Sequence, residues 1–240
     1  MAGIASTRRA AIAAPAAAMM MGSAMAQPAS KPATMSCLII APEGPITAAV
    51  REALVAVGTR VTTRYPAAFT DAAYAEAFLT GADKPGKTDL VVAIAIPERN
   101  GAVGKVKPAD FQKVVVDNYG RMFLAMKHGI QVLRASGGGQ FIAMTSTDGR
   151  SGRIDAAAAS AAANGITIMV RSATLECAQK NDNVRVNAIQ VGDIVDTSVA
   201  PQLGQVHMAD VTRAVAYLAA AGSVYLTGVV MPVDNGGAAS

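Results

Sequence analysis

SCLIIAPEGPITAAVREALVAVGTRVTT, residues 36–63, contains a strand, a helix and a second strand in close succession. Its first apolar run ends at Pro42 and is typical of a strand that is buried on both faces. From Ile46 to Val57 apolar residues recur at helical spacing, and Gly58 ends the helix. A second strand follows at once, so we expect two parallel strands joined by a right-handed crossover.

The same alternation continues to the end of the chain. We expect further strands at residues 88–97, 141–147, 184–194 and 224–234, and helices at residues 71–81, from 108 to about 135, at 156–179 and at 209–222. Parallel strands that alternate with helices form a doubly wound α/β sheet with helices on both faces. The sequence therefore predicts one α/β domain over residues 36–240, and a length of 240 residues suits a single large core.

The charge balance argues against a nucleic-acid-binding surface. The net charge is +4, but Arg8, Arg9 and Lys31 account for three of the 21 basic residues, so the remaining 18 nearly balance the 17 acidic ones. A nucleic-acid-binding domain would need a basic excess on one face. Cys37 and Cys177 show no metal spacing and are expected to be buried free thiols. His128 and His207 stand apart, with His128 expected on the outer part of its helix, so no metal site is predicted.

Residues 1–35 differ from the rest of the chain and are expected to be a leader and a linker. MAGIASTRR supplies a basic start, an apolar stretch follows, and SAMA before Gln27 has the small-residue spacing of a signal-peptidase site. Export to the periplasm is the preferred interpretation. A mitochondrial transit peptide and a cytoplasmic tail stay open as alternatives. Pro15 and the many alanines argue against a transmembrane span.

Five segments together resemble the short-chain dehydrogenase/reductase family, over about residues 36–237. They are DNYGRMF (117–123), TSTDG (145–149), RSATLECA (171–178), RVNAIQVGDIVDT (185–197) and YLTGVVMPVDNGG (225–237). The resemblance implies a Rossmann-like sheet and enzymes that pass a hydride between a nicotinamide and a carbonyl or alcohol. The chain is shorter than the family in two places, which predicts a six-stranded sheet without the usual third, edge strand and a truncated substrate lid before Asp210.

The resemblance also assigns the family's catalytic positions. The family uses a Tyr as acid and base, a Lys four residues later, a Ser thirteen residues before the Tyr and an Asn upstream. The matching residues here are Ala159, Ala163, Ser146 and Asn118. A methyl group carries no titratable proton, so we expect Ser146 and Asn118 to be remnants of a site that has lost its proton-transferring pair.

The cofactor turn also departs from the family pattern. The residues that match its glycine-rich turn are Ala41, Gly44, Pro45, Ile46 and Thr47. Side chains and a proline at this turn predict poor access for a pyrophosphate, so no cofactor is expected to bind. Arg64, near the end of the second strand, could at best meet the 2′-phosphate of NADP. Without the edge strand, the adenine pocket is expected to lose a wall.

Three hypotheses for function follow. The preferred one is a catalytically inert subunit that assembles with itself or a partner through helices 118–135 and 156–179 and the closing strand. The first alternative is an NAD(P)-dependent oxidoreductase with a rearranged site, and the second is a small-molecule-binding protein that uses the vacated cleft. Charged residues at the mouth of the site could replace the Tyr, namely Asp148, Arg150, Arg153, Asp155 and Asp193. Ser146, Asn118 and Asp193 would be the polar contacts of a bound small molecule.

Overall fold

The computed structural model describes residues 34–81, 87–99 and 101–239. Almost all of the predicted leader and linker, residues 1–35, lies outside the described residues. From Thr34 on, the chain forms one compact unit. Within the described part, no helix has the length and apolarity needed to cross a membrane.

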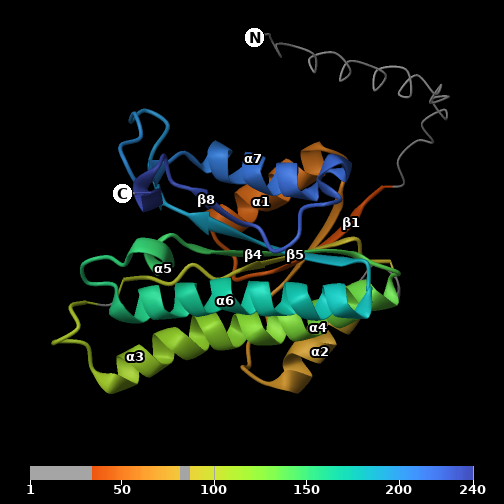
Figure 1. Ribbon diagram of the computed structural model, residues 1–240, viewed down its shortest axis with the longest axis horizontal. Coiled ribbons are helices and arrows are strands. Elements are labelled where there is room, and N and C mark those ends of the chain that lie inside the picture. Colours follow the sequence, from red (N-terminus) through yellow and green to blue (C-terminus); the bar gives the residue numbers. More distant parts are fainter. Residues whose placement is uncertain (1–33, 82–86, 100, 240) are drawn as a thin grey trace, which may run out of the picture. The chain divides into compact units, whose positions relative to one another are not determined.

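The centre of the domain is a parallel sheet of six strands in the order β2-β1-β3-β4-β5-β8 (Figure 1). The strands are β1 (Ser36–Ile40), β2 (Arg60–Arg64), β3 (Leu90–Ile94), β4 (Gly139–Ser146), β5 (Val184–Val191) and β8 (Val230–Val233). β2 is an edge strand, and in the described part of the chain one helix, α2, lies between it and β3. The predicted doubly wound sheet without the usual third strand is therefore confirmed.

Helices cover both faces of the sheet (Figure 1). They are α1 (Pro45–Ala56), α2 (Asp71–Gly81), α3 (Pro108–Val115), α4 (Arg121–Ala135), α5 (Asp148–Ser151), α6 (Ala157–Lys180) and α7 (Met208–Ala219). α1 and α7 bury their apolar faces in one cluster, and α2, α4 and α6 bury theirs in another on the opposite face. Cys37 and Cys177 are buried free thiols in these two separate clusters.

Short elements complete the fold. They are the π-helix η1 (Val116–Gly120), the strands β6 (Asp193–Ile194) and β7 (Gln205–Val206), and the 3-10 helices η2 (Ala221–Ser223) and η3 (Gly237–Ala239). The small β6–β7 pair occupies the place between β5 and α7, where the sequence predicts a truncated lid. The long helix predicted from Pro108 is interrupted by η1, whose wider turn contains Asn118.

The alanine-rich start of α6 lets another segment approach it closely. Ala159 and Ala163 are both 0% exposed. An added Cβ on Gly149 of α5 would lie 2.4 Å from the Asn164 nitrogen and 2.8 Å from the Ala163 Cβ. Small residues on both helices are therefore required where α5 packs on α6.

The expectation for His128 is wrong. His128 is 8% exposed instead of facing outward, and its Nε2 lies 2.8 Å from Asp71 Oδ1 at the start of α2. Its ring also packs near Phe78. Because α2 packs against α4 at this point, the His128 side chain is buried and pairs with Asp71 of α2. His128 therefore ties two helices together.

Candidate active site

A cleft of about 400 Å³ opens at the carboxyl ends of β1 and β3. Ile40 and Ile94 line it from these two strand ends, residues 42–47 from the turn before α1, and Asn118 from η1. The chain order reverses between β1 and β3, and open α/β sheets bind their ligands in the crevice at such a reversal. The volume lies within the range of small-molecule sites.

The turn before α1 suits an anionic group better than its sequence suggests. Pro45 is the first residue of α1, where a helix uses no N–H from that position. The first intrahelical bond runs from the Ala48 N–H to the Gly44 carbonyl, 2.9 Å, so the N–H groups of Ile46 and Thr47 have no carbonyl partner within the helix. Such groups at a positive helix end attract phosphates. The residues present therefore fit a dinucleotide at this turn.

Tyr65, after β2, and Arg121, at the start of α4, line one side of the cleft. Arg121 donates from Nη1 to the Pro66 carbonyl, 2.9 Å, and its guanidinium carbon lies 5.2 Å from the centre of the Tyr65 ring. The Phe69 ring packs directly on Gly120: a Cβ added to Gly120 would lie only 2.7 Å from the Phe69 Cζ. Tyr65 and Arg121 both line the cleft. The segment after β2 thus forms part of the wall of the cleft, and the loss of a wall of an adenine pocket stays a prediction.

Arg64 does not reach the cleft, where it was expected to meet a 2′-phosphate at best. Its Nη1 donates to the Thr63 carbonyl at 3.0 Å, its Nη2 to the Thr80 carbonyl at 3.4 Å, and it is not among the residues that line the cleft. Arg121 supplies the cleft with a guanidinium instead. Sequence reasoning missed Arg121 because it lies in a helix 57 residues further along the chain, and only the fold brings it beside Tyr65.

Ser146 and Asn118 both bond to nearby backbone. The Ser146 Oγ accepts the Asp148 N–H at 3.0 Å, and the Asn118 side chain donates to the Val114 carbonyl at 2.8 Å. Ser146 ends β4 at the same edge of the sheet as the cleft. Whether Ala159 and Ala163 occupy the family's Tyr and Lys positions stays a prediction, and these two side chains can carry no proton.

Four charged side chains meet at the carboxyl edge of β3, β4 and β5. Arg99 donates to Asp193 at 2.6 Å and Arg153 to the other oxygen of Asp193 at 2.5 Å. The Asp148 carboxylate lies beneath them, with its oxygens 3.4 Å from Arg99 Nε and 3.5 Å from Arg153 Nε. The fold thus unites three of the five predicted charged residues and adds Arg99. We call this set the four-charge cluster.

The other two predicted residues lie apart from the four-charge cluster. Arg150 donates to the Ala238 carbonyl at 3.1 Å. Asp155 sits in a left-handed turn at φ 60°. Arg99 was missed, although it follows β3 on the side where the other strands also end. The rule that parallel strands share one carboxyl edge would have pointed to it.

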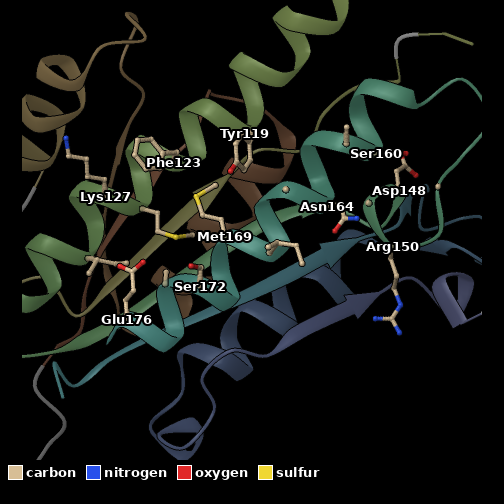
Figure 2. A pocket seen from close by; sticks show the side chains of 18 of the residues that line it. Tyr119, Phe123, Lys127, Asp148, Arg150, Ser160, Asn164, Met169, Ser172 and Glu176 are labelled. Carbon is tan, nitrogen blue, oxygen red and sulfur yellow. The ribbon is translucent and has the colours of Figure 1, made fainter. Parts of the chain in front are cut away.

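A second hollow is a groove of about 1160 Å³ along α4 and α6, outside the sheet. Phe123 and Lys127 line it from α4, and Met169 and Glu176 from α6 (Figure 2). Figure 2 also shows that the Arg150 guanidinium points away from these helices. No group of three or more possible metal ligands occurs among the residues that the structure describes.

A cleft at the reversal point of a doubly wound parallel sheet is typical of dinucleotide-binding proteins. A family model described as short chain dehydrogenase matches residues 16–206, so this chain belongs to the short-chain dehydrogenase family.

Two relatives match in sequence. The cis-4-hydroxycyclohexanecarboxylate dehydrogenase of Sinomonas cyclohexanicum is 27% identical over 63% of this chain and 66% of its own length. The NADP-dependent (R)-specific alcohol dehydrogenase of Lentilactobacillus kefiri is 28% identical over 69% of this chain and 72% of its own length.

Solved structures confirm the fold. The structure of ElxO with NADP bound is similar with a TM-score of 0.76 at 16% identity, and the match covers 87% of this chain and all of that one, 100%. The 3-ketoacyl-(acyl-carrier-protein) reductase from Brucella melitensis complexed with NADH gives a TM-score of 0.73 at 18% identity, over 85% of this chain and 98% of that one.

The comparisons contradict the hypothesis of an inert assembly subunit. The matching family and both relatives are named dehydrogenases, which favours the alternative of an NAD(P)-dependent oxidoreductase. The preferred hypothesis of the sequence was therefore wrong. The expectation that no cofactor binds has no support in these comparisons either, and one of the two relatives is named NADP-dependent.

Proposed function

We propose that this protein is an NAD(P)-dependent oxidoreductase with a rearranged active site. The observation that carries the proposal is the cleft at the reversal point of the sheet, in a chain whose relatives are dehydrogenases. A bound nicotinamide dinucleotide would supply the hydride acceptor for an alcohol or, when reduced, the hydride donor for a carbonyl.

Residues of the cleft divide between the two ends of such a ligand. The N–H groups of Ile46 and Thr47 would bind the pyrophosphate at the start of α1. Tyr65 and Arg121 would flank the nucleoside end, where Arg121 is held by the Pro66 carbonyl and the Tyr65 ring. Glu43, which also lines the cleft, forms an ion pair with Arg51 at 3.3 Å, so its charge is partly balanced.

Ser146 and Asp148 are the groups we propose for the proton. The Ser146 hydroxyl would hold the substrate oxygen at the end of β4. In the oxidation direction the alcohol O–H proton passes to a carboxylate oxygen of Asp148, while the C–H hydrogen leaves as a hydride with its electron pair. In the reverse direction the same carboxyl returns the proton to the carbonyl oxygen. Asp148 is held next to Ser146, because its backbone N–H bonds the Ser146 Oγ at 3.0 Å, while its carboxylate pairs with Arg99 and Arg153.

Cofactor binding tests the proposal. Millimolar NAD⁺, NADH, NADP⁺ and NADPH are added separately to the protein, and thermal unfolding is followed. A bound ligand at 100 times its Kd stabilises the folded state by about 2.7 kcal/mol, so at least one of them should raise the Tm. Gly44→Phe should fold normally, because nothing lies within 4 Å of an added Cβ there, and should lose the shift because the ring enters the cleft.

Gly104→Phe is the matched control, because Gly104 also has open space around it but does not line the cleft. This variant should keep the Tm shift. If none of the four dinucleotides raises the Tm of the unchanged protein, the proposal is wrong. If Gly44→Phe keeps the full shift, the dinucleotide does not lie in this cleft.

The proton assignment has a separate test. Asp148→Asn should abolish turnover and leave the cofactor-dependent Tm shift in place, whereas Asp155→Asn should keep both. Asparagine is a fair replacement at Asp155 because it tolerates the left-handed conformation there. Normal turnover by Asp148→Asn would remove Asp148 from the mechanism.

We further propose that two copies of the chain pair through the groove along α4 and α6. Phe123 on α4 and Ile168 on α6, which both line it, are 52% and 54% exposed, and exposed apolar side chains that gather in one groove are typical of an interface. Lys127 on α4, which also bonds Asp71 of its own chain, and Glu176 on α6 would oppose each other in a twofold pair.

Ile168→Glu should convert a dimer into a monomer in analytical ultracentrifugation. Leu79→Glu, at a position that is 76% exposed on α2 and does not line the groove, should not. A monomeric unchanged protein would contradict the pairing.

Export to the periplasm, with cleavage after Ala26, remains our proposal for the leader. N-terminal sequencing of the protein recovered from its native cells would test it. A mature chain that begins at Gln27 supports export, and an intact Met1 contradicts it.

A further inference from the structure

Arg99 and Arg153 of the four-charge cluster form a two-armed carboxylate clamp. Arg99 reaches one oxygen of Asp193 and Arg153 reaches the other, at 2.6 and 2.5 Å. The two guanidiniums come from different segments, one after β3 and one after β4. They therefore hold a single carboxylate from both sides, which is the arrangement that proteins use to recognise carboxylates.

Asp148 keeps the two arms of the clamp in place. Its side chain is only 4% exposed, and its oxygens lie 3.4 and 3.5 Å from the Nε atoms of Arg99 and Arg153. A buried carboxylate between two guanidiniums balances one of their charges and leaves a net charge of +1. The Asp148 N–H bonds the Ser146 Oγ, so the clamp lies next to the hydroxyl that we propose binds the substrate oxygen.

Asp193 is the replaceable member of the cluster. Its side chain is 39% exposed, ten times the value for Asp148, and it sits at the start of the two-residue strand β6. Exposed ion pairs contribute little to stability, so breaking the two contacts with Asp193 costs little. The contacts with Asp193 are made by the Nη2 groups of Arg99 and Arg153, and among the described residues their Nη1 groups have no hydrogen-bond partner. Both guanidiniums can therefore also donate to a carboxylate that takes the place of Asp193.

We propose that Asp193 occupies the place of a substrate carboxylate, and that a monocarboxylate displaces it and binds across Arg99 and Arg153. The substrate would then be a hydroxy acid or the corresponding oxo acid, with its carboxylate in the clamp and its oxygen at Ser146. This choice of substrate class rests on the proposed oxidoreductase function, whereas the binding of a carboxylate does not.

Benzoate binding, measured by isothermal titration calorimetry, tests the clamp, with neutral benzamide as the matched probe. Asp193→Asn removes the internal competitor and should tighten benzoate binding about tenfold or more, because the neutral amide no longer pairs with the two guanidiniums. Benzamide binding should not change.

Adding Arg153→Gln to Asp193→Asn should abolish benzoate binding. Adding Arg150→Gln should not, because Arg150 lies nearby in α5 but its guanidinium donates to the Ala238 carbonyl. If Arg153→Gln does not fold, Arg153→Lys keeps the charge without the fork and should weaken binding several-fold.

The proposal is overturned if Asp193→Asn does not tighten benzoate binding, or if Arg150→Gln weakens it as much as the change at Arg153. It is also overturned if neither the unchanged protein nor Asp193→Asn binds benzoate. The cofactor-dependent Tm shift, measured on the same samples, separates two failures. A cofactor shift without benzoate binding rejects only the clamp, and benzoate binding without a cofactor shift rejects only the oxidoreductase function.

Discussion

Gly149→Ala tests the close packing of α5 on α6. An added Cβ would lie 2.4 Å from the Asn164 nitrogen, 2.7 Å from the Ala163 carbonyl carbon and 2.8 Å from the Ala163 Cβ. Two of these atoms are backbone and the third is a methyl group attached to it, so none can turn aside. The helix α5 must therefore move, and overpacking of this kind costs typically about 1–3 kcal/mol.

A cost of about 2 kcal/mol lowers the Tm by roughly 4–8 °C for a chain of this size. Circular dichroism during heating measures it, and Gly104→Ala is the control because an added Cβ meets nothing within 4 Å there. Because α5 begins with Asp148, its displacement should also weaken benzoate binding by the clamp. Equal Tm values for the two variants would refute the reasoning about α5 and α6.

Three further predictions concern other parts of the fold. Hydrogen bonds from Lys127 and His128 lower the pKa of Asp71, so the ionised Asp71 carboxylate stabilises the fold at neutral pH. This stabilisation is lost as the pH falls through the lowered pKa. Asp71→Asn should therefore lower the Tm at neutral pH, and the difference in Tm from the unchanged protein should disappear in acid. Burial raises the pKa of both Cys37 and Cys177, so a thiol reagent should modify them at neutral pH only after unfolding, and rapid reaction of the native protein would contradict their burial. Arg121→Ala should lower the Tm and weaken cofactor binding, whereas Arg213→Ala, at a side chain that is 72% exposed, should do neither.

The strands and helices could be predicted from the sequence because each has a local pattern. β1 and β3 are continuous apolar runs, and a parallel strand covered on both faces has that composition. The helix expected at residues 71–81 begins as predicted, and Thr70 just before it accepts a hydrogen bond from the Ala73 N–H at 3.2 Å. The missing edge strand was visible as a short distance along the chain between β2 and β3.

Partners that are distant in sequence could not be predicted. Arg99 and Asp193 are 94 residues apart, and His128 and Asp71 are 57 apart, so no local spacing joins them. The functional hypothesis rested on assigning Ala159 and Ala163 to two catalytic positions of the family, which stays a prediction. It took no account of the charged groups from three strand ends that the fold gathers at the same edge of the sheet.

Deuterium transfer tests the proposed oxidoreductase function most directly. The protein is incubated with NAD⁺ or NADP⁺ and with 4-hydroxycyclohexanecarboxylate or cyclohexanol, each carrying deuterium on the carbon that bears the hydroxyl, and the cofactor is analysed by mass spectrometry. We expect reduced cofactor that carries the deuterium, with the hydroxy acid ahead of the neutral alcohol. Cofactor that binds but acquires no deuterium from either compound, at any enzyme concentration, would contradict the account.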